Sequence, residues 1–304
     1  MASLPWLEPS VNQFQRLLQS GRMPHAVLVA VDTGLGARAL LEELAASALC
    51  TALTPLGACG QCKSCQLFNA GNHPDFYPIE ADGNQIKVDQ IRSLIGKLAT
   101  TAQQGGKRLA VIYGAERMNH AAANALLKTL EEPGEQTLIL LHTDTPAQLL
   151  PTLKSRCQKL AFQAPDNGQI ATWLSAQQLA TDAMWALPIA GGPLKLADYL
   201  HNNYITVLEQ FRVDWLSSLS TGHLCASLKD IREEQIIDAL KVLYVVLMDE
   251  VRRLSGINAL AAAKVAGLSG EIMAVCHMLT TMPSVNYLAL CHRIVSSYQG
   301  LKAE

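Results

Sequence analysis

An apolar segment, a glycine-containing loop and a helix-forming segment follow one another near the start of this 304-residue chain. Residues 26–30 read Ala-Val-Leu-Val-Ala, residues 31–38 read Val-Asp-Thr-Gly-Leu-Gly-Ala-Arg, and residues 39–49 are rich in alanine and leucine. Strand, glycine turn and helix in this order are the layout of a P-loop, whose pattern is G-x-x-x-x-G-K-[ST]. We therefore expect an α/β fold of the P-loop NTPase type.

The loop keeps glycines of a P-loop but lacks the groups that handle phosphate. Gly34 and Gly36 lie in the turn, and Gly36 fits the second glycine of the pattern. Val31 stands at the first glycine, Ala37 at the lysine and Arg38 at the Ser/Thr. The lysine contacts the terminal phosphates and the hydroxyl holds Mg²⁺, so this degenerate loop supplies neither function. We expect no ATP hydrolysis by the chain alone, while the sequence leaves open whether the loop still holds a nucleotide.

The second strand of a P-loop ATPase ends in acidic residues that hold Mg²⁺ and polarise water. Here the apolar run 109–112 leads into Tyr113-Gly114, with no carboxylate at the strand end. Glu116 follows, and we place it on the solvated face of a turn. Two independent losses favour an inactive site. An atypical active ATPase is the alternative, and turnover by the isolated chain would favour it.

Composition indicates packed globular domains, because 49% of the residues are hydrophobic and 16% are charged. The formal net charge of −2 argues against a protein that holds nucleic acid by its overall field. We find no apolar run approaching the roughly 18–20 residues that span a bilayer, and no signal peptide. We therefore expect a cytoplasmic protein without membrane partners, whose eight cysteines are reduced.

Strand and helix patterns alternate in the first half of the chain, as expected for a parallel sheet. Apolar spacing predicts a helix over residues 88–99. Asn119 can cap a further helix over 121–132, which Pro133-Gly134 ends. The candidate strands are residues 26–30, 75–80, 108–113, 137–142 and 159–162.

The strand signal ends after residue 165, so we expect an α/β domain over residues 1–165. Residues 166–205 form a small helical domain, in which Gly191-Gly192-Pro193 joins two helices. Residues 206–304 form a second helical domain with long amphipathic segments, which include residues 231–254 and 270–282.

Four cysteines lie within sixteen positions: Cys50, Cys59, Cys62 and Cys65, with the spacing C-x8-C-x2-C-x2-C. Two thiolates of a C-x-x-C turn can reach one ion, and four close a tetrahedral shell without an open position. We expect one structural Zn²⁺ in a module over residues 50–65. An iron–sulfur cluster, four unrelated thiols, and a metal or redox centre of catalytic function are the alternatives. The other cysteines are expected to be ordinary buried residues: Cys157, Cys225, Cys276 and Cys291.

The helix after the second strand carries the run Asn-Ala-Leu-Leu-Lys-Thr-Leu-Glu-Glu-Pro over residues 124–133. With the cysteine cluster, the Asn-His-Pro-Asp segment at 72–75 and the missing P-loop lysine, this run resembles the clamp-loader branch of AAA+ proteins, in its bacterial DNA polymerase III form. The resemblance is close over residues 1–165. It implies an AAA+ domain, a helical lid over 166–205 and a helical collar over 206–304.

The resemblance also implies a function. The chain would be a non-hydrolysing subunit of the clamp loader, which places the sliding clamp on primed DNA during replication. It would sit in a five-membered ring beside ATP-binding subunits of the tau/gamma type and the delta subunit, with no intrinsic enzyme activity. Clamp and DNA would be partners through the complex.

Ser155-Arg156-Cys157 matches the S-R-C motif of clamp-loader subunits. By resemblance, Arg156 projects into the ATP site of a neighbouring subunit, where it is catalytic in trans. A permanently charged planar guanidinium suits the charge that grows on the γ-phosphate in the transition state.

Four further polar residues stand where active relatives place functional groups or where a site could be imagined. Thr143 matches a γ-phosphate sensor, but we expect a strand-end hydrogen-bonding residue. Lys195 lies near the position where active relatives place a second sensor arginine. A surface position for Lys195 is an equally good interpretation. His73 and Asp75 flank Pro74, and we expect a turn that enters a strand rather than a metal site or an acid–base pair.

Overall fold

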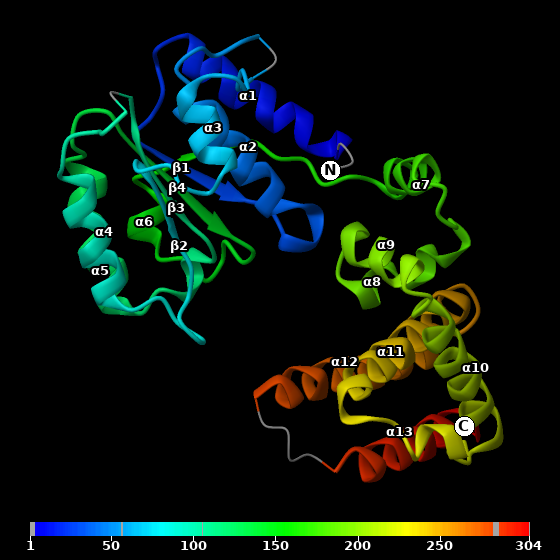
Figure 1. Ribbon diagram of the computed structural model, residues 1–304. Helices are drawn as coiled ribbons and strands as arrows, with labels where there is room; N and C mark the ends of the chain where they lie inside the picture. Colours follow the sequence, from blue (N-terminus) through cyan, green and yellow to red (C-terminus); the bar gives the residue numbers. More distant parts are fainter. Residues whose placement is uncertain (1–3, 56, 105, 282–285, 304) are drawn as a thin grey trace. The chain divides into compact units, whose positions relative to one another are not determined.

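The protein, described by a computed structural model over residues 4–55, 57–104, 106–281 and 286–303, divides into two compact units. The first is Met1–Gln169 and the second is Ile170–Glu304. The first unit contains a sheet flanked by helices, and the second contains only helices among its described residues (Figure 1). The α/β class of the first half and the helical character of the second are confirmed. A division of the helical part at about residue 205 stays a prediction.

The first unit is built on one five-stranded parallel sheet with the order β2-β3-β4-β1-β5. Strand β1 lies between β4 and β5. The loop that follows β1 therefore lies at the carboxyl edge of the sheet, beside the loops that follow these two strands. The strands are β1 (Ala26–Ala30), β2 (Phe76–Ile79), β3 (Arg108–Ile112), β4 (Thr137–Thr143) and β5 (Gln158–Lys159). The first four lie where the sequence predicts them.

The fifth strand differs from the prediction of residues 159–162. Pairing with β1 covers only residues 158–159, and Leu160 donates one further backbone hydrogen bond to Leu28. The backbone of Ala161 then bonds to helix α1 (Glu8–Gln19) instead of the sheet. Its N–H donates to the Gln13 side chain at 3.1 Å, and its carbonyl accepts from the Ser10 hydroxyl at 2.8 Å. These side chains end the strand.

Buried strands point their side chains alternately to the two faces of the sheet. Ala26 and Leu28 of β1 pack in a core with helices α4 (Val88–Leu98) and α5 (His120–Glu131). The opposite face is covered by α1 and α2 (Ala37–Leu49), as Figure 1 shows. Both faces are therefore buried, which explains why the strands are almost continuously apolar.

The helices of the first unit begin and end close to the predicted positions. The Asn119 side chain accepts a hydrogen bond from Ala122 N–H at 2.8 Å, so it caps α5 as predicted. Two short helices complete the unit: α3 (Lys63–Asn69) and α6 (Pro151–Lys154).

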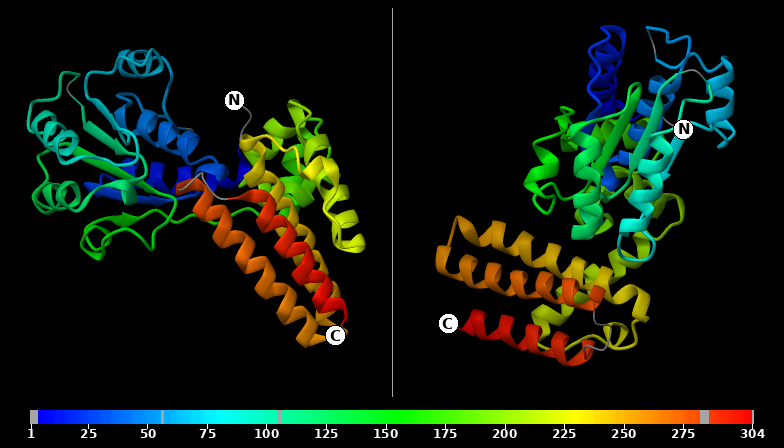
Figure 2. Two further views of the ribbon diagram at one scale, coloured as in Figure 1. Left: turned by 90° about the horizontal axis from the view of Figure 1, so that it is seen from below. Right: turned by 90° about the vertical axis from the view of Figure 1, so that its left-hand side faces the viewer.

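The second unit is a set of helices that starts with short ones and continues with long ones. Gly191 and Gly192 have φ of +77° and +147° and join α8 to α9, as predicted. The long helices α11, α12 and α13 pack side by side (Figure 2). The helices, with α7 starting just before the unit boundary, are α7 (Asn167–Ala176), α8 (Leu187–Ala190), α9 (Pro193–His201), α10 (Ile205–Thr221), α11 (Glu233–Ser255), α12 (Ala259–Thr281) and α13 (Tyr287–Ala303).

Helix α12 begins eleven residues before the predicted start at residue 270. Asn258 caps it, accepting a hydrogen bond from Ala261 N–H at 3.1 Å. The predicted end at Met282 lies outside the described residues. Residues 259–279, with a mean hydropathy of 1.5, are long and apolar enough to cross a membrane by length and composition only, and 39% of the most apolar window is buried in the structure. The expectation that no segment reaches this length was therefore wrong.

Hydrogen bonds join residues on both sides of position 205 within the second unit. The phenols of Tyr199 and Tyr204 donate to the Asp238 carboxylate at 3.3 and 3.1 Å. Lys241 donates to the carbonyl of Ile189 at 3.1 Å. Helix α11 thus holds the short helices that precede α10.

Candidate functional site

The degenerate P-loop connects β1 to α2 at the carboxyl edge of the sheet. A short 3-10 turn, Thr33–Leu35, leads to Gly36, whose φ of +95° favours glycine. Helix α2 begins at Ala37, which is fully buried. The Trp6 indole donates to the carbonyl of Leu35 at 2.8 Å and fixes the turn from outside. The strand, loop and helix expected from the sequence are present.

Carboxylates of the chain itself occupy two N–H groups of this loop. Asp32 accepts from Gly34 N–H at 2.7 Å. Asp144, which follows β4, accepts from the N–H of Thr33 at 2.7 Å and from its hydroxyl at 2.9 Å. In a working P-loop the backbone N–H groups cradle phosphates. Here the carboxylates of Asp32 and Asp144 accept hydrogen bonds from two such N–H groups.

A pocket of about 210 Å³ lies beside the loop. Arg38 enters it but is already engaged, since it pairs with Glu80 and lies 4.7 Å from the centre of the Tyr113 ring. The hydrogen bond that Arg38 donates to Glu80 raises the pKa of Arg38 above its ordinary value. Arg117 is also held, and donates to the carbonyl of Gly83 at 2.5 Å. The lining residues are Thr33, Arg38, Glu80, Ala81, Tyr113, Gly114, Glu116, Arg117, His142 and Asp144.

The pocket is lined by three carboxylates and two arginines. Glu80, Glu116 and Asp144 line it, while both arginines bond to groups of the chain. Glu116 lies on the 3-10 turn Ala115–Arg117, as predicted. It is half-buried and lines the pocket, so its expected place on a solvated face was wrong.

His142, on β4, bonds to the segments that follow β1 and β3. The sequence analysis did not predict a role for it. Its Nε2 lies 2.9 Å from the carbonyl of Val31, and its Nδ1 accepts from Gly114 N–H at 3.2 Å. This pattern requires a neutral ring that donates from Nε2. Thr143, the next residue, is fully buried, and its hydroxyl accepts from Thr145 N–H at 3.2 Å. That bond agrees with the strand-end role expected for Thr143.

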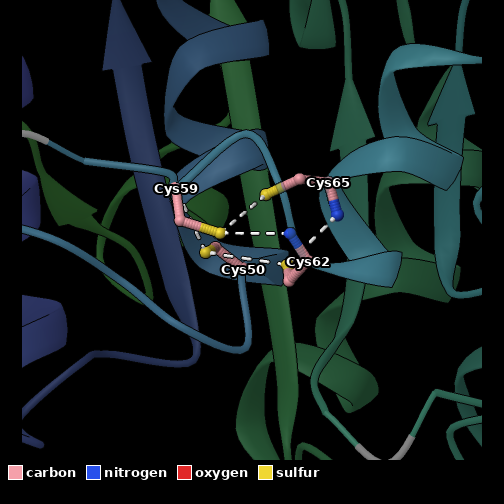
Figure 3. Close-up of side chains that lie close together, drawn as sticks. All are labelled: Cys50, Cys59, Cys62 and Cys65. Atoms are coloured by element: carbon pink, nitrogen blue, oxygen red, sulfur yellow. Dashed lines mark hydrogen bonds between the residues drawn. The ribbon is translucent and has the colours of Figure 1, made fainter.

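The four cysteines converge on one point from three short segments (Figure 3). Cys50 follows α2, Cys59 lies in the loop, and Cys62 and Cys65 belong to the first turn of α3. All four sulfurs lie within 4.8 Å of one another, with Cys50–Cys62 and Cys59–Cys65 at 4.0 Å. Tetrahedral Zn–S bonds of about 2.3 Å place sulfurs about 3.8 Å apart. The cluster therefore fits one zinc ion.

Hydrogen bonds favour the charged form of two of these thiols. The N–H of Cys62 lowers the pKa of Cys59. Burial opposes the charge on Cys62, but hydrogen bonds from Thr51 and Cys65 outweigh it and lower its pKa to about 5. Burial raises the pKa of Cys50, and burial with neighbouring thiols raises that of Cys65 to about 12. Binding of a divalent ion would stabilise all four sulfurs as thiolates, including those of Cys50 and Cys65.

His73 and Asp75 are not among the ligands of the cysteine cluster; His73 contacts the module, and Asp75 binds a different loop. His73 is buried, and its Nε2 lies 2.7 Å from the hydroxyl of Ser64, which donates to Leu49 at 2.6 Å. Asp75 accepts backbone N–H bonds from Gln103 at 2.8 Å and Gln104 at 2.9 Å. Both residues lie in the turn before β2, as expected, and hold it to its surroundings.

Arg156 lies just beyond α6 and is about one-third exposed. Its Nε and Nη2 contact Glu131 Oε1 at 2.8 and 2.5 Å, and Nη1 donates to the carbonyl of Thr152 at 3.0 Å. Arg156 is absent from the described lining of the pocket beside the degenerate loop.

The remaining candidates take structural positions. Lys195 is exposed, and its amine lies 5.3 Å from the centre of the Tyr199 ring. The other four cysteines lie outside the four-cysteine cluster and are free thiols: Cys157 and Cys225, which are half-buried, and Cys276 and Cys291, which are buried.

Comparison with known proteins decides the family. The model of the family described as "DNA polymerase III, delta subunit" matches residues 6–166. The DNA polymerase III subunit delta' of Pseudomonas aeruginosa is 38% identical over 229 residues, which are 73% of this chain and 69% of that protein. The chain belongs to the DNA polymerase III delta-prime family. The delta' subunit of Escherichia coli is 36% identical over 275 residues, 88% of this chain and 82% of that protein.

This delta-prime family member also resembles a solved structure in its fold. A DNA polymerase III gamma subunit-related protein from Thermotoga maritima superposes with a TM-score of 0.52 at 16% identity, covering 96% of this chain and 99% of that one. The likeness supports the AAA+ type of fold expected from the sequence. The family model and the curated relatives, not this structure, confirm the resemblance to the bacterial polymerase III clamp-loader family.

Proposed function

We propose that this chain is a non-hydrolysing subunit of the DNA polymerase III clamp loader and that it donates Arg156 to the ATP site of a neighbouring subunit. Family membership supports the clamp-loader role. The observation that carries the finer claim is the occupied loop: Asp32 and Asp144 bind the N–H groups that would cradle phosphate. Arg156, about one-third exposed, lies outside the described lining of the pocket beside that loop and would be available to a neighbouring subunit.

The missing groups explain why the chain would not turn over ATP. Ala37 replaces the P-loop lysine, and Tyr113-Gly114 follows β3 where a carboxylate would hold Mg²⁺. The acidic pocket adds repulsion to these losses. Such a subunit contributes a rigid surface and a charge, and we expect no catalysis by it alone.

Arg156 can stabilise charge in a neighbouring site because a guanidinium stays charged at all physiological pH values and binds two oxygens at once. Supplied in trans, such a group is worth roughly 10³–10⁵ in rate in GTPases. The neighbours would be ATP-binding subunits of the tau/gamma type and the delta subunit, in a ring of five. The helices of the second unit would form its lid and its share of a collar.

The zinc module completes the proposal. Four thiolates at tetrahedral spacing fill the coordination of Zn²⁺, so the ion would be structural. It would hold the segment between α2 and α3, while the sulfurs lie too close together for a cluster of several iron atoms. A hydrolytic role centred on these cysteines would need an open coordination position that this arrangement lacks.

Reconstitution of the clamp loader tests the arginine. We expect Arg156→Ala to assemble normally but to slow ATP hydrolysis and clamp loading on primed DNA, partly, because other subunits keep their own sites. Arg156→Lys should not restore the full rate, since an ammonium lacks the forked geometry. Arg92→Ala, an exposed arginine on α4, is the matched control. Equal rates for Arg156→Ala and wild type in confirmed assemblies would refute the donor role.

A further inference from the structure

The guanidinium of Arg156 is held along one edge by a single carboxylate. Nε and Nη2 both contact Oε1 of Glu131, at 2.8 and 2.5 Å. Glu131 is the last residue of α5, and Arg156 comes 25 positions later, after α6. Because these elements belong to one packed unit, the contact fixes the direction of the arginine relative to the sheet.

The other edge of the guanidinium is held more loosely. Nη1 donates to the carbonyl of Thr152 at 3.0 Å and to the hydroxyl of Ser155 at 3.3 Å. A guanidinium has five N–H groups. With Nε and one N–H of Nη2 on Glu131, the second N–H of Nη2 has no acceptor among the described residues, and the Ser155 contact is the longest of the set. One N–H group, on Nη2, thus remains free to meet a phosphate oxygen, and the Nη1 N–H that bonds to Ser155 makes the longest contact that could be exchanged for another.

We propose that Glu131 is a positioning residue, which holds Arg156 in the orientation that reaches a phosphate group of a neighbouring chain. This inference rests on the proposed donor role of Arg156. Glu131 immobilises one edge of the guanidinium before the subunits meet, so less side-chain freedom is lost when the arginine engages. It does not touch the nucleotide itself.

Stability alone does not account for the pair. The side chain of Glu131 is 50% exposed and that of Arg156 is 34% exposed, and ion pairs so exposed add little to folding. Glu131→Gln should therefore leave the fold and the assembly intact. It keeps the size of the side chain and an oxygen acceptor but removes the charge that binds two N–H groups.

The test compares Glu131→Gln, Glu132→Gln, Arg156→Ala and the double variant Glu131→Gln/Arg156→Ala in the reconstituted loader with ATP and primed DNA. Glu132 is the exposed neighbour at the end of α5 and serves as the matched control. We expect Glu131→Gln to lower kcat with little change in KM, by less than Arg156→Ala and by at most about 30-fold, the rotamer freedom of one arginine. The double variant should equal Arg156→Ala, and Glu132→Gln should equal wild type.

A second readout does not depend on activity. In the full chain, the Arg156 Nε–H signal in ¹H–¹⁵N NMR spectra should exchange slowly with water in wild type and Glu132→Gln, and rapidly in Glu131→Gln. Unchanged or faster turnover in Glu131→Gln, beside a slow Arg156→Ala, overturns the positioning role and leaves the donor role standing. No effect of Arg156→Ala overturns both.

Discussion

Asp144, at the end of β4, accepts hydrogen bonds from both the backbone N–H and the hydroxyl of Thr33 in the loop after β1. The register of the two strands brings these residues together, since Ala30 pairs with Thr143. A carboxylate therefore sits where a P-loop would receive an anion. In the proposed function, this carboxylate adds to the loss of the P-loop lysine in disfavouring a bound phosphate.

Isolated chain should show no ATP hydrolysis above background, with or without primed DNA. Asp144→Asn should loosen the loop, because a neutral amide is a weaker acceptor than a carboxylate. It should still show no turnover, since Ala37 offers no ammonium. The measurement is phosphate release together with binding of a fluorescent ATP analogue. Turnover that survives stringent purification and disappears in Arg38→Ala or Glu116→Gln would contradict this expectation.

One zinc ion per chain should be present in protein prepared without chelators. Cys62→Ser should lose it and unfold the 50–69 segment, because Zn²⁺ binding of about 10–16 kcal/mol in small peptides is lost when a ligand is removed. Cys157→Ser, a change outside the cluster, is the control. Elemental analysis and limited proteolysis check both points, and wild-type protein without zinc would refute the site.

Alkaline pH should reveal the burial of Tyr113. Burial raises the pKa of this phenol to about 12, against an ordinary value of 10. The folded state keeps the proton that the unfolded state loses, so this contribution is complete below pH 10 and disappears as pH rises towards 12.

Tyr113→Phe removes the titrating group and keeps an aromatic ring beneath Arg38. Between pH 10 and 12 its free energy of unfolding should fall less steeply than that of wild type, as measured by urea denaturation. Identical slopes would show that the Tyr113 phenol is not shielded from water in the fold.

Primed DNA should bind the isolated chain only weakly, with a dissociation constant of about 10⁻⁶ M or weaker at physiological salt, as for non-specific contacts. The net charge of −2 provides no general attraction. Fluorescence anisotropy over a range of salt concentrations tests this. A nanomolar dissociation constant at physiological salt would contradict this prediction.

Patterns of neighbouring residues in the sequence predicted the buried strands and most of the metal site. Buried parallel strands are continuous apolar runs, so β1, β3 and β4 could be located from sequence, and the spacing of Cys59, Cys62 and Cys65 defined most of the metal site. The end of β5 could not be predicted, because side chains of α1 capture its backbone from about 150 positions away.

The roles of Asp144, His142 and Glu131 depend on register and packing between distant segments. His142 reaches Val31 across 111 positions, and Glu131 reaches Arg156 across 25. A single sequence contains no signal for such contacts. The side chain of Glu116 was misplaced for the same reason, since its burial depends on what packs around the turn.

Helix α2 runs from Gly36 in the degenerate loop to Cys50 in the metal cluster, a length of about 20 Å for its 13 residues. Trp6 and Asp144 hold the turn at one end, and thiolates anchor the other. In an ATPase that binds nucleotide at this loop, the N-terminus of the helix would contact the phosphate groups. If the chain binds no nucleotide, as proposed, both ends of α2 are set when the chain folds, and the position of the helix does not depend on a phosphate ligand. In the proposed assembly, we therefore expect nucleotide-driven motion to originate in the ATP-binding subunits.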